Sequence, residues 1–99
     1  MHVVVPRWKL ERALTALGEK RDVRVVFFTD HVSLQHGAFC ADVECFGATD
    51  MDNPRVFESV DLTPIFLVPE RDIREEVEFL CEDKQLIMRV SVTYEHRLV

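Results

Sequence analysis

The sequence predicts a single α+β domain over residues 1–99, made of two β-α-β-β-β halves at about residues 1–50 and 51–99. The stretch at 23–34 recurs in pattern at 77–88, each reading as an apolar strand, a tight polar turn and an alternating strand. Only Val23 and Val77 are identical between the two stretches, so two unrelated hairpins are the alternative to a duplication. A helical segment precedes each stretch. Because consecutive strands pair antiparallel, we expect a mostly antiparallel sheet with both helices on one side.

The first half opens with a β-branched strand and an amphipathic helix. Met1–Val5 is rich in valine and is ended by Pro6, which suits the first turn of a helix. Gly18 is a typical stop for that helix. The apolar positions recur at close to helical spacing and predict a buried stripe: Trp8, Leu10, Ala13, Leu14 and Leu17.

Three strands are predicted after this helix. Val23–Thr29 is apolar on both alternating sets, which is typical of a strand covered on both faces. Val32–His36 follows the turn at Asp30-His31, and Gly37 marks a bulge or bend. Alternating residues from Phe39 to Phe46 indicate a half-buried strand.

The second half repeats this order less regularly. Arg55–Val60 is predicted as a strand, and Asp61 is a candidate cap for a short helix at Leu62–Val68, for which a strand is the alternative. Val77–Glu82 is predicted as a strand, and alternation from Leu86 to Glu95 predicts another.

Charge and composition limit the classes of function. The net charge of −6 argues against non-specific nucleic-acid binding by the whole surface. Residues 1–25 hold six Lys and Arg against three Asp and Glu, a surplus of +3, so the remainder must carry −9. No membrane span and no signal peptide are recognised, which predicts a cytoplasmic protein with no membrane partner. Three cysteines are an odd number and argue against a disulfide framework.

The plan of the chain resembles one domain of the DNA sliding clamps, most closely the bacterial polymerase III β-clamp type. Four segments carry the resemblance: Val3–Leu14, Val32–His36, Phe57–Phe66 and Lys84–Val90. The resemblance implies a non-catalytic, clamp-like module that encircles duplex DNA and tethers partner proteins, with helices lining the hole of a six-domain ring. A ring would take about six copies of this chain, or domains from other chains. The segment Leu62–Val68 is shorter than the implied second helix and lies in an acidic half.

The resemblance also names candidate DNA contacts. Five basic residues on or just after the first helix would face the phosphate backbone in a salt-sensitive, sequence-independent way: Arg7, Lys9, Arg12, Lys20 and Arg21. A solvated face of an amphipathic helix is the alternative interpretation of these residues.

A second set of candidates lies at the end of the chain. The stretch from Val90 to Val99 is predicted as an edge strand, with Val92, Tyr94 and Leu98 as interface residues. An exposed edge predicts self-association into a homo-oligomer or strand addition to a partner. The alternative function is therefore a small regulatory or inhibitory protein-binding module that does not encircle DNA.

No catalytic or metal-binding pattern is recognised, so we expect no enzyme, no cofactor, no metal and no small-molecule substrate. A Ser-His-Asp order with a nucleophile elbow, a glycine-rich phosphate loop and a His-Glu-x-x-His run do not occur. His36, Cys40 and Cys45 are the nearest approach to a zinc set, but their spacing does not match paired ligands. Asp50 and Asp52 lack the glycine and the terminal glutamate of a calcium loop.

Overall fold

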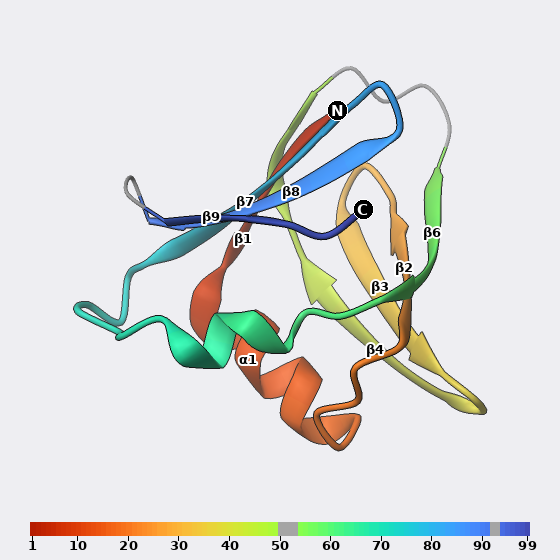
Figure 1. Cartoon of the computed structure of the whole chain (residues 1–99), viewed down its shortest axis with the longest axis horizontal. Coiled ribbons are helices and arrows are strands. Elements are labelled where there is room, and N and C mark those ends of the chain that lie inside the picture. Colours follow the sequence, from red (N-terminus) through yellow and green to blue (C-terminus); the bar gives the residue numbers. More distant parts are fainter. Residues whose placement is uncertain (50–53, 92–93) are drawn as a thin grey trace.

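The computed structural model describes residues 1–49, 54–91 and 94–99, and side chains outside 47–53 and 91–93. In these residues the chain forms strands, one α-helix and one 3-10 helix (Figure 1). Their order is β1 (His2–Pro6), α1 (Arg7–Ala16), β2 (Val23–Phe27), β3 (His31–His36), β4 (Phe39–Glu44), β5 (Phe46–Thr49), β6 (Arg55–Val60), η1 (Thr63–Leu67), β7 (Glu76–Glu82), β8 (Gln85–Ser91) and β9 (Tyr94–Arg97).

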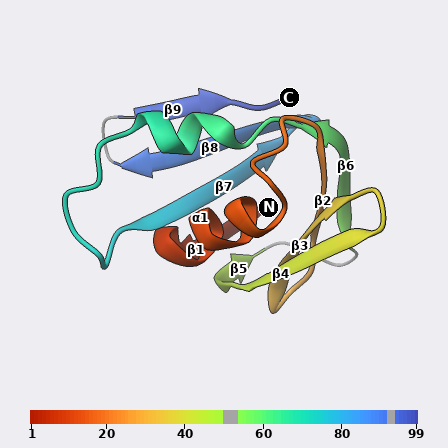
Figure 2. The same ribbon diagram turned by 90° about the horizontal axis from the view of Figure 1, so that it is seen from below.

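The strands form two sheets whose described pairs are all antiparallel. One sheet has five strands in the order β5-β1-β7-β8-β9, and the other has four in the order β4-β3-β2-β6. The two sheets splay apart at the end of the molecule where α1 and η1 lie (Figures 1 and 2). The prediction of an α+β fold with antiparallel sheet is confirmed.

In each sheet, a hairpin lies next to a strand from the other half of the chain. The β2–β3 hairpin accepts β6, and the β7–β8 hairpin accepts β1. Phe27 from one hairpin and Phe79 from the other meet with their ring centroids 5.3 Å apart. One cluster of buried side chains therefore joins both sheets.

Helix α1 begins and ends as the sequence predicts. Pro6 has no backbone N–H to leave unpaired at the start of the helix. At the other end Gly18 adopts a φ of +80°, and the amides of Gly18 and Glu19 donate to the carbonyls of Thr15 and Leu14. This is a Schellman motif, which satisfies carbonyls that the helix itself leaves unpaired.

The apolar stripe of α1 differs from the prediction at its N-terminal end. Leu10, Ala13, Leu14 and Leu17 are buried, but Trp8 is 43% exposed. Trp8 is two positions from Leu10, which is more than half a helical turn around the axis. Arg7 is spaced three and seven residues from Leu10 and Leu14, and it occupies the buried stripe instead.

The second predicted helix is a short 3-10 helix, and the alternative of a strand at Leu62–Val68 is wrong. The N-cap position is Leu62, one residue after the predicted Asp61, but Asp61 still accepts hydrogen bonds from the backbone N–H and the hydroxyl of Thr63 at the start of the helix. Pro64 supplies no N–H and Pro69 follows closely, so the segment has no room to extend into a longer α-helix.

Two predicted strands are each divided in the structure. The run from Phe39 to Phe46 breaks at Cys45, where the chain passes from β4 in one sheet to β5 in the other. The alternating run that begins at Leu86 forms β8 and then β9, which pair with each other antiparallel. Period-two alternation does not show a reversal of direction, because it is the same before and after the turn.

In the described part of the chain, no helix has the length and apolar composition to span a membrane.

Candidate functional site

Arg7 does not lie on a surface that DNA can reach. It is only 3% exposed, and its guanidinium is enclosed between α1 and the chain that follows η1. Nε donates to Glu11 Oε1 at 2.8 Å and one terminal nitrogen donates to Glu75 Oε2 at 2.8 Å. The other terminal nitrogen donates to the carbonyl oxygens of Ile65, at 3.1 Å, and Val68. The prediction of Arg7 as a DNA contact is therefore corrected: its charge is used inside the protein.

The ionisation of this cluster follows from its contacts. Burial acts to lower the Arg7 pKa, but its hydrogen bonds with Glu75 and Glu11 outweigh this effect and hold the pKa above the ordinary value. The pKa of Glu75 lies below its usual value, because the backbone N–H of Arg71 and the Arg7 guanidinium both donate to the carboxylate. The cluster is thus held in its charged form, and it joins α1 to the carbonyl end of η1.

The other four basic candidates lie at the surface. Lys9 Nζ approaches Glu44 Oε2 of β4 at 3.3 Å and lies 5.5 Å from the centroid of the Trp8 ring. Arg12, Lys20 and Arg21 are exposed, and no ion pair involves them among the residues with a described placement. The structure brings Lys9 and Arg12 together beside one groove.

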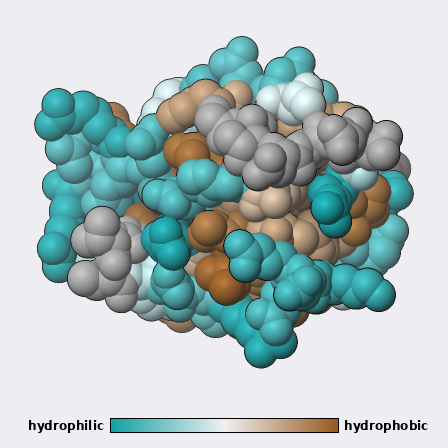
Figure 3. Space-filling model, turned by 90° about the horizontal axis from the view of Figure 1, so that it is seen from above, coloured by the Kyte–Doolittle hydropathy of each residue, from teal (hydrophilic) through white to brown (hydrophobic). Residues whose placement is uncertain are grey.

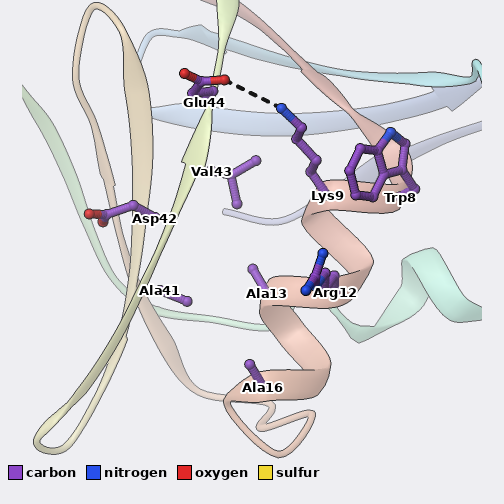
Figure 4. Close-up of a pocket in the computed structure, with 9 residues that line it drawn as sticks. All are labelled: Trp8, Lys9, Arg12, Ala13, Ala16, Ala41, Asp42, Val43 and Glu44. Atoms are coloured by element: carbon purple, nitrogen blue, oxygen red, sulfur yellow. Dashed lines mark hydrogen bonds and ion pairs between the residues drawn. The ribbon is translucent and has the colours of Figure 1, made fainter.

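This groove, which lies between α1 and β4, is open to solvent and has a volume of about 380 Å³ (Figure 4). Its floor consists of small and apolar side chains from both elements: Ala13, Ala16, Ala41 and Val43. Its rim carries the larger and charged side chains: Trp8, Lys9, Arg12, Asp42 and Glu44. Ligand sites in proteins combine an apolar lining with a few polar groups in this way. We call this feature the α1–β4 groove.

The charges around the groove are unequal. Lys9 and Glu44 pair across one end, as the dashed line in Figure 4 shows. Asp42 points away from α1 in the same view, on the face of the sheet that its partner Ser33 shares. Two rim charges, Arg12 and Asp42, have no ion pair in the described structure, and Asp42 is the one that is directed away from α1.

Only part of the predicted edge strand Val90–Val99 is an edge: Tyr94–Arg97 forms β9, which ends the five-stranded sheet, whereas Val90 belongs to β8, which lies between β7 and β9. Tyr94 and Leu98 are partly buried and pack against the core, so their side chains are turned inward. Val92 lies outside the described residues. The face of the molecule opposite α1 is largely hydrophilic, with apolar side chains visible in small groups (Figure 3). What β9 offers a partner is therefore its backbone edge, more than its side chains.

The cysteines lie in separate surroundings. Cys40 is exposed, and its Sγ lies 3.2 Å from Ser33 Oγ. Burial, followed by the charge of Asp30, raises the pKa of the Cys45 thiol, which opposes its use as a nucleophile. Within the described ranges, no three His, Cys, Asp or Glu side chains gather as a metal site would require. Asp50 and Asp52 lie outside the described residues.

No family model matches this sequence, and no curated protein or solved structure matches the chain.

Sequence reasoning found the basic residues of the groove but not the groove itself. Ala13 and Ala16 are three residues apart on one side of the helix, and Ala41 and Val43 are two apart on one face of a strand. Those spacings show that each pair shares a face. They do not show that the two faces lie opposite each other.

Proposed function

We propose that this chain is a non-catalytic protein-binding module whose duplicated architecture is of the clamp type. The observation that carries the proposal is an unpaired sheet edge, β4, beside a groove with an apolar floor and a charged rim. Edge strands offer main-chain donors and acceptors to an incoming segment, and an apolar groove supplies pockets for its side chains. Three other strands also end a sheet in the described structure, and of these β9 is the edge that the sequence predicts; the other two are β5 and β6.

The arrangement of hairpins supports the clamp-type part of the proposal. The β2–β3 and β7–β8 hairpins occupy corresponding places in the two sheets, and each is preceded in the chain by a helix. Two similar halves of this kind are what the resemblance to a clamp domain implies. The second helix differs, since η1 is a short 3-10 helix.

The distribution of charge favours a protein over DNA as the partner. The Arg7 guanidinium is buried and bonded to groups inside the protein, and Lys9 forms an ion pair with Glu44. The whole chain carries a net charge of −6, which repels a polyanion unless a dense basic surface overcomes it. Three surface basic residues of the predicted five have no ion pair within the described structure.

Solution mass and partner stoichiometry test the proposal. Light scattering over a range of protein concentrations is expected to give a monomer or a dimer. A partner from an extract of the source cells is expected to stay bound through size exclusion at one-to-one stoichiometry. A chain that assembles into closed rings and retains no protein contradicts the proposal.

The second candidate function is DNA association by a self-assembled ring of about six copies. The exposure of Arg12, Lys20 and Arg21 at and after the C-terminal part of α1 favours it. The test is retention of duplex DNA at rising salt by the wild type and by the triple variant Arg12→Glu, Lys20→Glu, Arg21→Glu. Counterion release predicts that retention falls steeply with salt and is lost in the variant. Arg7 is left unchanged, because its substitution would disturb the fold.

A further inference from the structure

The free edge of β4 and the floor of the α1–β4 groove belong to one surface. In the described structure β4 pairs with β3 on one side and ends the sheet on the other. Ala41 and Val43 point from β4 toward α1 (Figure 4). A strand added at the normal spacing of about 4.8 Å would continue this sheet and keep its alternation. Every second side chain of that added strand would then face the same side as Ala41 and Val43, toward α1.

The lining of the groove selects apolar side chains at these inward positions. Ala13 and Ala16 present only methyl groups on the α1 wall, so space is left between the helix and β4. Trp8 is 43% exposed at one end of the groove and offers an aromatic surface. Covering this surface would remove apolar area from water, which is the main favourable term in association.

The charges of the rim select an acidic residue in the incoming segment. Lys9 and Glu44 neutralise each other at one end. Asp42 is directed to the far face of the sheet, so it does not offset Arg12 across the groove. An occupant with a carboxylate next to its apolar residues would pair with Arg12, and an occupant with a basic residue there would be repelled.

We propose that the α1–β4 groove binds an extended segment of a partner protein, in which apolar residues alternate with polar ones and an acidic residue meets Arg12. The segment adds to β4 as a further strand, and its apolar side chains enter the groove. This inference rests on the proposed function, since it assigns the surface and the chemistry of the protein partner.

Random 12-residue peptides displayed on phage provide the probe. The wild-type protein is the target, and the variant Ala16→Glu serves for counter-selection, since it places a negative charge on the groove floor. Enriched sequences are expected to be extended, apolar and acidic. A synthetic, fluorescently labelled peptide from the enriched set is then titrated with each protein variant by fluorescence polarisation.

Matched variants separate the groove from the rest of α1. Ala16→Glu and Arg12→Glu are expected to weaken binding at least about tenfold, equivalent to about 1.4 kcal/mol. Thr15→Glu is the control, because Thr15 is exposed on the same helix turn but does not line the groove. It introduces the same charge one residue away and is expected to leave affinity unchanged. Added salt should weaken peptide binding, because it screens the attraction between Arg12 and the acidic residue of the peptide.

Amide hydrogen exchange identifies the edge that the peptide uses. Protection of amides in β4 on peptide binding is the expected result, since strand addition gives them new acceptors. Binding that Ala16→Glu does not weaken, with protection in β9, overturns this inference and leaves the proposed function standing. Self-association that Ala16→Glu abolishes, without peptide binding, also overturns it, since the occupant would be a second copy. If neither a peptide nor any partner binds, both proposals fail.

Discussion

The two sides of helix α1 use basic residues in opposite ways. On the side that meets η1, Arg7 is enclosed and donates to two carboxylates and to main-chain carbonyls. On the side that meets β4, Lys9 and Arg12 stand at the rim of an open groove. The position of a basic residue around the helix axis therefore decides whether its charge is buried in the fold, as for Arg7, or left exposed, as for Arg12.

Side-chain size explains why one side is closed and the other open. The long Arg7 side chain reaches the carbonyls of Ile65 and Val68 at the end of η1. On the other side Ala13 and Ala16 face Ala41, and short side chains on both walls cannot fill the space between helix and strand. The closed side is expected to contribute stability, and the open side is expected to contribute little stability and to bind.

Arg7→Leu is the change expected to have the largest effect. It would leave Glu11 and Glu75 without their cation and two carbonyls of the η1 segment without a donor. We expect a loss of about 3 kcal/mol in the free energy of unfolding, since breaking a buried charge network leaves uncompensated groups. Urea denaturation followed by circular dichroism measures this loss.

Arg12→Leu is the matched control for that experiment, with an expected change below about 0.5 kcal/mol because the side chain is exposed. Arg7→Lys should restore only part of the stability, since an ammonium group cannot reproduce the planar fork of donors. Equal losses for Arg7→Leu and Arg12→Leu would refute the distinction between the two sides.

Glu75→Gln is expected to have an intermediate effect that depends on pH. The folded-state pKa of Glu75 is lower than in the unfolded chain, so its contribution is fully present above the ordinary value and is lost as pH falls through the folded pKa. We expect a cost of about 1.5 kcal/mol near neutral pH, the scale of a hydrogen bond to a charged group. The gap in stability between wild type and variant should close as pH is lowered through the folded-state pKa of Glu75, which lies below the ordinary value. Denaturation series at several pH values measure this gap, and a gap that stays constant would contradict the assigned role of the carboxylate.

The pair of Lys9 and Glu44 across the groove is expected to have the smallest effect. Glu44 has an 83% exposed side chain, so solvent screens the pair. A double-mutant cycle with Lys9→Met and Glu44→Gln should give a coupling energy of about 0.3 kcal/mol that fades with added salt. A coupling above about 1 kcal/mol would show that this side of α1 is also a structural contact.

The separate parts of the candidate site can be predicted from the sequence. The helix, the basic residues Lys9 and Arg12, and the strand that carries Ala41 and Val43 all follow from local spacing. The burial of Arg7 also had a local signal, since it is spaced three and seven residues from Leu10 and Leu14. The charge of Arg7 alone favours an exposed position, whereas its angular position on the helix indicates a buried one.

The division of the predicted strands was not available from the sequence. Cys45 continues the alternation of its neighbours, yet its N–H donates to Asp30 O at the point where the chain leaves one sheet for the other. Alternation indicates which face of a strand a residue occupies, but it does not indicate which sheet the strand joins.

The sequence by itself determined the local elements: the hairpins, the start and stop of α1, and the apolar faces that had to be buried. These follow from the near-neighbour rules of helix and strand geometry, which act over a few residues. Only the tertiary structure decided that β1 pairs with β7 and β6 with β2, that Arg7 donates a hydrogen bond to Glu75, and that α1 faces β4 across a groove. The strand pairs among those contacts join residues from 28 positions apart (Phe27 and Arg55) to 78 positions apart (His2 and Leu80), where side-chain volume and chain path set the distance and no local propensity acts.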